Sequence, residues 1–313
     1  MSKALIIGAA GFAGSALRSE LINNGYEVVC ADVMSTDDSI IKVDMLDFVA
    51  ADKLIEDAKP DMIFNLAGQA SPFVSWQKIG LTMHLNVDLS VNICESVARH
   101  CPECRILFIG SANQYDMNTV GEDGLVGENT ALTSDSPYSI SKNTQEAILK
   151  LLAKKYNLDI VSTRSFNHIG PTQKPGFVVT DYCMRIAQLE AGKLESFGYG
   201  NLDSWRDFSD VRDVVRAYRL IAEKGKSGEI YNVGSGKSFY IRDIIGVLVQ
   251  MSEVATEKTV LPPRLDEDKL VHYRSDNTKL YEDTGFEPEI DIMKDTVPSV
   301  LEAYRELVKE GKL

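Results

Sequence analysis

Short runs of consecutive apolar residues recur through the first 170 residues of the chain. Runs of this length, rich in β-branched residues and without polar alternation, are typical of strands buried on both faces of a parallel sheet. They predict five strands: Ala4–Ile7, Glu27–Ala31, Asp61–Asn65, Arg105–Ile109 and Asp159–Thr163.

Helical patterns lie between these runs. Ile148, Leu151, Leu152 and Tyr156 recur at the i, i+3, i+4 and i+8 spacing that places them on one face of a helix. Strands that alternate with helices predict an α/β fold with a doubly wound parallel sheet of the Rossmann type.

The pattern changes after about residue 170, where Pro171, Pro175 and Gly176 interrupt it. A proline-rich and charge-rich stretch follows later, at Leu261–Lys269. We expect residues 1–170 to form the first domain and residues 171–313 mainly a smaller C-terminal α/β lobe, with segments around 205–235 returning to the first domain. The elements expected after the break are a helix over Thr180–Gly192, a strand over Glu229–Val233 and a helix over Ile241–Met251.

Length and charge narrow the class of protein. The 313 residues suit one large α/β domain with an appendage. The net charge of −13 disfavours nucleic acid and anionic membranes as partners. No apolar run approaches the roughly 20 residues that a membrane helix needs, and the run after Lys3 is too short for a signal peptide. We therefore expect a cytoplasmic protein.

Two of the five cysteines, Cys101 and Cys104, form a C-x-x-C pattern. A zinc site needs two further ligands, and the sequence has no second C-x-x-C and no paired histidines. Because the pair directly precedes an apolar strand, we interpret it as a loop with incidental thiols and expect no metal.

A glycine-rich turn follows the first strand and precedes a helix. Gly8, Gly11 and Gly14 have the spacing G-x-x-G-x-x-G, with Phe12 and Ala13 inside the turn. Glycines permit a tight turn and close approach of a pyrophosphate, which the free N–H groups of the helix N-terminus then bind. The turn predicts a dinucleotide cofactor, although a glycine-rich corner without a ligand has the same residues.

The carboxyl ends of the next strands supply further candidates for cofactor binding. Asp32 ends the second strand, where a carboxylate accepts from ribose hydroxyls and repels a 2′-phosphate. Because Val33–Ser39 contains no arginine, NAD is favoured over NADP. The other candidates are Asp44 and Met45, expected to close the third strand, and Leu66, Ala67 and Gly68 after the fourth.

Tyr138 and Lys142 are spaced i and i+4, which places a phenol and an ammonium on one helix face. A neighbouring cation lowers the pKa of a phenol from about 10, so that it exchanges protons near neutral pH. Ser111 follows a buried strand at the same sheet edge. A hydroxyl there can bond the same substrate oxygen, and the set suits carbonyl–alcohol redox chemistry. A serine hydrolase is disfavoured because no G-x-S-x-G elbow is present.

With this glycine turn, Ser111 and the Tyr138-x-x-x-Lys142 motif, the chain resembles the extended short-chain dehydrogenase/reductase family. Three longer segments resemble the branch of GDP-mannose 4,6-dehydratases and GDP-4-keto-6-deoxymannose reductases. They are Arg164–Pro171, Gly176–Val179 and Gly200–Val214.

The resemblance implies roles for further residues. Lys142 holds Tyr138 and the cofactor ribose, and Phe166 and His168 face the nicotinamide. The sugar nucleotide is held by Asn167, Phe177, Val178 and Arg206. Arg206 suits a diphosphate clamp, although an ion pair with Asp207 or Asp210 would explain it too. His168 is equally explained as a core histidine bonded to backbone. The resemblance also implies a homodimer through the helices that follow Asn86 and Tyr138.

Three departures from this branch affect the reaction. Asn113 stands where the dehydratases have a glutamate, and an amide cannot remove the sugar C5 proton. Arg264 is present near the expected diphosphate site, but Asp266 and Glu267 follow where a second arginine is expected. Reductases of this type often use NADPH, which Asp32 does not suit.

The residues therefore favour reduction of a nucleotide-linked 4-keto-6-deoxyhexose, with Asn113 and Arg264 near the substrate. Three alternatives stay open: an NDP-sugar 4-epimerase with tightly bound NAD, a GDP-mannose 4,6-dehydratase, and a non-catalytic NAD-sensing protein.

Overall fold

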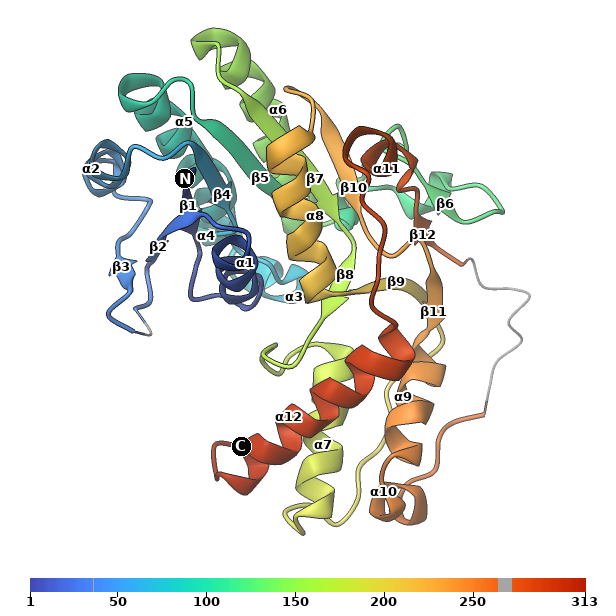
Figure 1. The fold of residues 1–313 in the computed structure, drawn as a ribbon. Helices are drawn as coiled ribbons and strands as arrows, with labels where there is room; N and C mark the ends of the chain where they lie inside the picture. The colour runs from blue at the N-terminus through green and yellow to red at the C-terminus, as the bar shows by residue number, and fades with distance from the viewer. Residues whose placement is uncertain (36, 264–271) are drawn as a thin grey trace.

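A seven-stranded sheet forms the centre of the larger lobe (Figure 1). The structure is a computed structural model and describes residues 1–35, 37–263 and 272–313. The strand order is β10-β7-β5-β4-β1-β2-β3, and all neighbours are parallel. The predicted doubly wound parallel sheet is confirmed. Its strands are β1 (Lys3–Ile7), β2 (Glu27–Asp32), β3 (Ile40–Lys42), β4 (Met62–Asn65), β5 (Arg105–Ser111), β7 (Ile160–Ser165) and β10 (Ile230–Val233).

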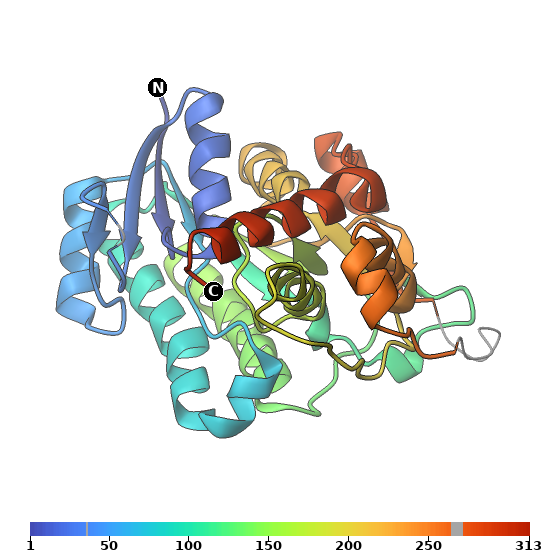
Figure 2. The ribbon, with the colours of Figure 1, turned by 90° about the horizontal axis from the view of Figure 1, so that it is seen from below.

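Helices cover both faces of this sheet because successive strand residues point to opposite faces. In β1, Ala4 and Ile6 pack against one helical layer, while Leu5 and Ile7 pack against the other. Figure 2 shows the dark-blue α1 and the teal α5 on opposite sides of the strands. The first layer contains α1 (Phe12–Asn23), α8 (Val211–Lys224) and α11 (Thr278–Thr284), and the second α2 (Phe48–Ala58), α5 (Leu89–His100) and α6 (Pro137–Tyr156).

The smaller lobe has its own hydrophobic core around a three-stranded sheet of order β11-β9-β8. It lies beyond the carboxyl edge of the large sheet, below it in Figure 1. Its elements are β8 (Asn167–Ile169), α7 (Val178–Glu190), β9 (Trp205–Asp210), β11 (Ser238–Tyr240), α9 (Ile241–Gln250), α10 (Glu253–Lys258) and α12 (Val297–Lys309). A parallel pair, β6 (Leu125–Val126) and β12 (Arg274–Ser275), lies beside it.

The chain passes between the two lobes more than once. β7 lies in the large sheet and β8 directly after it in the small one; β9 is again in the small sheet. α8 and β10 then return to the large sheet before β11 re-enters the small lobe. The carboxyl ends of β5 and β7 therefore lie where the chain crosses over.

Three strand ends differ from the prediction, and one of them is that of β7, which ends at Ser165 instead of Thr163. β3 ends at Lys42, so that Asp44 and Met45 follow the strand instead of closing it. β3 is an edge strand of only three residues, which gives the sequence pattern little to define its end. β5 extends to Ser111, which is its last residue.

Cys101 and Cys104 lie in the turn between α5 and β5, at the amino edge of the sheet and thus opposite Ser111. The Cys104 N–H donates to the Cys101 carbonyl at 2.8 Å, and both thiols are free. Within the described part of the chain, no helix has the length and apolar character that crossing a bilayer requires.

Candidate active site

The glycine turn leaves the N-terminus of α1 open to a ligand. Gly8 has a φ of +90°, and a Cβ there would lie 2.7 Å from the Ala67 nitrogen. A Cβ at Gly14 would lie 2.1 Å from the Gly8 carbonyl oxygen. Gly11 precedes the helix, and no side chain caps the N–H groups of its first turn. Such groups bind anions, and a cofactor pyrophosphate fits this position.

Replacing Gly14 with alanine tests this turn. The added methyl group overlaps the Gly8 carbonyl, so the backbone must shift. We expect a loss of unfolding free energy of about 1–3 kcal/mol and an affinity for NADH about tenfold lower, measured by denaturant unfolding and fluorescence titration. Gly246→Ala in α9 is the control, because its Cβ would make only an ordinary contact, 3.8 Å from Leu261. Unchanged affinity in Gly14→Ala would contradict a phosphate site in this turn.

Asp32 lies at the end of β2, directly beside the glycine turn. Its carboxylate accepts from the Ala10 N–H at 2.9 Å and from the Met34 N–H at 2.9 Å. The Arg18 guanidinium lies 3.6 Å from the Asp37 carboxylate of this loop. This cation was missed in the sequence, because Arg18 belongs to α1 and not to the loop. The Asp32 carboxylate would repel a 2′-phosphate at this position, and Arg18 is already paired with the Asp37 carboxylate.

The other predicted cofactor residues lie along the same edge of the sheet. Asp44 is exposed and accepts from the Leu46 N–H at 2.9 Å, while the Met45 side chain is buried. The Leu66 N–H donates to the Ile7 carbonyl at 2.8 Å, and the Ala67 nitrogen lies against Gly8. The assignment of these residues to the cofactor stays a prediction.

Gly68 connects this edge with the predicted catalytic residues. A Cβ at Gly68 would lie 2.6 Å from the Asn86 amide oxygen and 3.8 Å from the Lys142 Nζ. Its φ of +153° also favours glycine. The backbone at this position therefore approaches Lys142 closely.

Ser111, Tyr138 and Lys142 come together at the carboxyl edge of the sheet. α6 begins at Pro137, and the Ser136 hydroxyl caps it by accepting from the Ser139 N–H at 3.1 Å. This start places Tyr138 and Lys142 on the buried face of the first turns, with 6% and 7% of their surfaces exposed. The Ser111 hydroxyl lies near enough to the Tyr138 phenol to lower its pKa. The three residues therefore form one cluster.

The protonation of this cluster differs from the prediction. Burial raises the pKa of Tyr138, and the neighbouring Ser111 hydroxyl only partly offsets this effect. The expected lowering by Lys142 is absent, because the Lys142 Nζ donates instead to the Ile109 carbonyl at 2.8 Å and to Gln145 at 3.2 Å. Burial lowers the pKa of Lys142 to about 8. Tyr138 is thus a protonated phenol at neutral pH.

Asn86 supports this cluster. From the sequence, it was predicted only to precede a helix. It lies in a π-helical segment, His84–Asp88, and is fully buried. Its amide oxygen accepts from the Gln69 N–H at 2.9 Å, and its Nδ2 donates to the Ser141 hydroxyl at 2.8 Å. The only sequence signal was an amide among the apolar positions of a helix.

Phe166 and His168 flank the crossover from β7 to β8. Phe166 is buried against Tyr115, with ring centres 6.4 Å apart. His168 stacks on Phe12 of the glycine turn at 5.9 Å, and its Nδ1 lies 3.1 Å from the Phe166 carbonyl. Burial lowers the pKa of His168, so the ring is neutral. The backbone partner fits a structural histidine, while the stacking places the ring beside the predicted phosphate site.

The predicted substrate residues lie around the small lobe and the crossover. Asn113 is exposed, and its N–H donates to the Ser111 hydroxyl at 3.2 Å. Asn167 is exposed on β8, and its Nδ2 donates to the Asp207 carbonyl at 3.3 Å. Phe177 precedes α7 with 45% of its surface exposed, and Val178 is the first residue of that helix. Arg264 lies outside the described residues.

Arg206 has no acidic partner among the described residues. It is exposed on β9 and donates to its neighbour's carbonyl, that of Trp205, at 2.7 Å. Asp207 instead accepts from Ser235, Gly236 and Ser275. Asp210 pairs with Arg212 at 2.8 Å. The ion pair that would have explained Arg206 structurally is therefore not formed.

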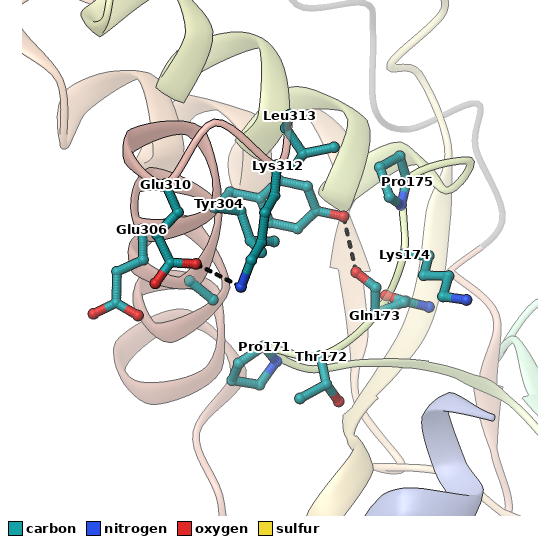
Figure 3. Close-up of a pocket in the computed structure, with 12 residues that line it drawn as sticks. Pro171, Thr172, Gln173, Lys174, Pro175, Tyr304, Glu306, Glu310, Lys312 and Leu313 are labelled. Atoms are coloured by element: carbon teal, nitrogen blue, oxygen red, sulfur yellow. Dashed lines mark hydrogen bonds and ion pairs between the residues drawn. The ribbon is translucent and has the colours of Figure 1, made fainter. Parts of the chain in front are cut away.

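A pocket of about 520 Å³ opens between α12 and the loop after β8 (Figure 3). Pro171 and Pro175 bound the loop side, and Tyr304 lies on the α12 side, where its hydroxyl donates to the Gln173 carbonyl at 2.8 Å. None of Ser111, Tyr138 and Lys142 lines it. The predicted catalytic cluster is thus separate from this pocket.

The uncapped helix after β1 and the Ser–Tyr–Lys cluster at the carboxyl edge of the same sheet are the arrangement of the extended short-chain dehydrogenases/reductases. Comparison with known proteins agrees. The chain belongs to the NAD dependent epimerase/dehydratase family, whose model matches residues 4–234.

Among the curated and solved relatives are a reductase, dehydratases and epimerases of nucleotide-linked sugars. GDP-6-deoxy-D-mannose reductase of Pseudomonas aeruginosa is 29% identical over 80% of this chain and 82% of its own length. The solved structure of RMD from Pseudomonas aeruginosa complexed with NADPH superposes with a TM-score of 0.83, at 25% identity, over 98% of this chain and 100% of that one. The solved structure of UDP-glucose 4-epimerase with UDP-glucose from Thermotoga maritima superposes with a TM-score of 0.85, at 26% identity, over 98% of this chain and 99% of that one. The chain is thus an enzyme of the NAD(P)-dependent epimerase, dehydratase and reductase group.

Proposed function

We propose that this chain reduces the C4 ketone of a nucleotide-linked 6-deoxyhexose of the GDP type. The observation that carries the proposal is the cluster of Ser111 and Tyr138, with Asn113 beside it where a dehydratase has its glutamate. The cluster suits transfer of a proton to a carbonyl oxygen, and the amide offers no base for elimination. The 29% identity to a GDP-6-deoxy-D-mannose reductase supports the same reaction.

The residues of the cluster divide the work of the reduction. A reduced nicotinamide, when bound, would supply hydride to C4 of the sugar. Tyr138, protonated because it is buried, donates its phenolic proton to the carbonyl oxygen, so that the ketone becomes an alcohol. The Ser111 hydroxyl orients that oxygen. The ammonium of Lys142, within reach of Gly68, holds the cofactor ribose.

Incubation with a GDP-4-keto-6-deoxyhexose and NADH or NADPH tests the reaction. We expect loss of absorbance at the wavelength of the reduced nicotinamide, with one alcohol formed per cofactor oxidised. No consumption with any 4-keto sugar nucleotide would overturn the proposal. We further propose NAD as the preferred cofactor, because Asp32 lies beside the glycine turn and Arg18 is paired with Asp37. The NADPH in the Pseudomonas aeruginosa structure makes this preference worth measuring directly.

A 4-epimerase is the second candidate, and Asp32 is the residue that favours it, since an epimerase keeps one NAD bound throughout. The TM-score of 0.85 to a UDP-glucose 4-epimerase is in line with it. Purified protein would then carry NAD, and it would interconvert NDP-sugars without net consumption of cofactor. A mass spectrum of the co-purified nucleotides separates the two candidates.

Arg206 is expected to bind the substrate diphosphate, because it is an exposed residue whose guanidinium lacks a carboxylate partner among the described residues. A hydrogen bond to a charged group is worth about 1.5–3 kcal/mol, so Arg206→Gln should raise KM for the sugar nucleotide about 10- to 100-fold. The KM for NADH should change little. Arg185→Gln is the control, since Arg185 donates to the Gly198 carbonyl within the same lobe. Equal KM values for the wild type and Arg206→Gln would exclude the clamp.

We also propose a homodimer, whose contact surface includes α6, as predicted, but not α5. α5, which follows Asn86, has no large apolar side chain that is exposed. Exposed apolar residues gather on α3 (Pro72–Gln77) and α4 (Ile79–Met83), which pack against α6: Phe73, Trp76, Ile79, Leu81 and Ile140. Apolar patches of this kind mark contact surfaces.

Trp76→Glu should shift the protein from dimer to monomer in light scattering coupled to size exclusion, because it places a charge in the proposed contact. Trp76 is 61% exposed, so its replacement leaves the core intact. Val49→Glu on α2, at a residue 76% exposed, controls for an added surface charge. A dimer that persists in Trp76→Glu and dissociates in Val49→Glu would place the contact elsewhere.

A further inference from the structure

Gln114, one turn beyond Ser111, connects the end of β5 with α6. It is 1% exposed. Its side-chain oxygen accepts from the Ser111 N–H at 2.9 Å, and its side-chain nitrogen donates to the Glu146 carboxylate at 3.2 Å. Because an ionised carboxylate only accepts hydrogen bonds, the amide has one orientation that satisfies both neighbours.

Glu146 is held on its other side by a buried arginine. Arg164 of β7, 3% exposed, donates from Nε and from Nη2 to the two carboxylate oxygens, each at 2.9 Å. Two parallel bonds of this kind fix the carboxylate in direction as well as in place. Arg164 donates further to the Glu128 carbonyl at 3.0 Å, and its guanidinium lies 4.9 Å from the centre of the Tyr115 ring.

The room for the Gln114 amide depends on Gly110. A Cβ at Gly110 would lie 2.6 Å from the Gln114 side-chain oxygen and 2.2 Å from the Thr163 carbonyl oxygen. Gly110 precedes Ser111, and because it has no side chain it leaves space for the Gln114 amide. The oxygen of that amide accepts from the Ser111 N–H. The Ser111 hydroxyl in turn lies near the Tyr138 phenol and lowers its pKa.

These contacts join the elements that carry the catalytic cluster. Tyr138, Lys142 and Glu146 are spaced four residues apart and share one face of α6. Arg164 fixes Glu146 from β7, and Gln114 transmits this position to Ser111 at the end of β5. The distance between the helix that holds Tyr138 and the strand that holds Ser111 is therefore defined by a chain of buried polar bonds.

We propose that Gln114 and Glu146 are positioning residues that hold the Ser111 hydroxyl beside the Tyr138 phenol. This inference rests on the proposed function insofar as it takes Ser111 and Tyr138 to be catalytic. In this proposal Gln114 and Glu146 act on neither the substrate nor the cofactor directly. Their effect on the reaction passes entirely through the placement of Ser111.

Gln114→Met tests the inference, because it keeps the length of the side chain and removes both of its hydrogen bonds. A misplacement near 1 Å costs about 100-fold in rate, so we expect kcat to fall about 10- to 100-fold. KM for the sugar nucleotide and Kd for NADH should stay within about twofold. Lys150→Met is the matched control: it removes the exposed partner of Glu146, at 3.0 Å, and leaves Gln114 in place.

A double-mutant cycle separates positioning from a general loss of structure. In a Ser111→Ala background, Gln114→Met should cause no further fall in kcat, because the group that it positions is already gone. An equal fall in both backgrounds would overturn the inference. Gln114→Asn, too short to span from Ser111 to Glu146, provides a second variant if Gln114→Met does not fold.

A crystal structure of Gln114→Met decides the question without substrate. The expected result is a Ser111 hydroxyl displaced from the Tyr138 phenol, and an unchanged distance between the Ser111 Oγ and the Tyr138 Oη would refute the inference. If the wild type turns over no 4-keto sugar nucleotide, the proposed function fails, while this comparison of structures still tests the positioning.

Discussion

Tyr138→Phe should lower kcat about 100- to 10,000-fold, the range that a positioned general acid contributes. The phenol lies beside Ser111, and burial keeps it protonated at neutral pH. The ring itself remains in the variant, so the packing of α6 should persist. Stopped-flow or steady-state assay of NADH consumption measures the effect, and a fluorescence titration should give a Kd for NADH within about twofold of the wild type.

The control for this variant is Tyr156→Phe. Tyr156 lies on the same helix, where its hydroxyl is 3.4 Å from Glu95, far along the chain from the cluster. Each of the two variants, Tyr138→Phe and Tyr156→Phe, therefore lacks one tyrosine hydroxyl of α6. If the kcat of Tyr138→Phe equals that of Tyr156→Phe, Tyr138 is not the proton donor of the reaction.

Lys142→Met is expected to abolish turnover and, at pH 7, to make the protein more stable. Burial lowers the pKa of Lys142 to about 8 from an ordinary value of 10.5. Between these values the unfolded chain binds a proton that the folded chain does not, so wild-type stability rises with pH in this window. Below pH 8 the buried charge costs the wild type about 3 kcal/mol.

Methionine removes that cost but also removes two hydrogen bonds, those to the Ile109 carbonyl and to Gln145. Each is worth about 1 kcal/mol, so we expect a net gain of about 1–2 kcal/mol at pH 7. The gain should shrink as the pH rises above 8. Urea unfolding at pH 7 and pH 9.5 measures it, with Lys154→Met, an exposed lysine of the same helix, as the control. A variant less stable than the wild type at pH 7 would show that the folded enzyme binds the charge favourably.

Much of the fold followed from local patterns. The runs at Ala4–Ile7 and Arg105–Ile109 are apolar on both faces because Leu5 and Ile7 pack on one helical layer while Ala4 and Ile6 pack on the other. Such runs identify central parallel strands directly. The end of β3 was predicted wrongly, since a three-residue edge strand leaves almost no pattern to read.

The chemistry of the candidate site was harder to predict, because it depends on distances between elements. The spacing of Tyr138 and Lys142 placed both on one helix face, but the ammonium bonds to a backbone carbonyl of β5, an acceptor that every strand offers. Gln114 and Asn86 were not predicted as part of the site for the same reason. Each is an ordinary amide in the sequence, and only the packing of α6 against its neighbours brings their partners within reach.

The place of β10 at the edge of the large sheet has a consequence for synthesis. β10 begins 65 residues after the end of β7, the strand with which it pairs. At about 5–20 residues per second, a ribosome needs roughly 3 to 13 s to make the intervening chain. During that time the nascent chain presents a bare strand edge on which another polypeptide can pair. The yield of this protein in a cell therefore depends on how well that edge is shielded while translation continues.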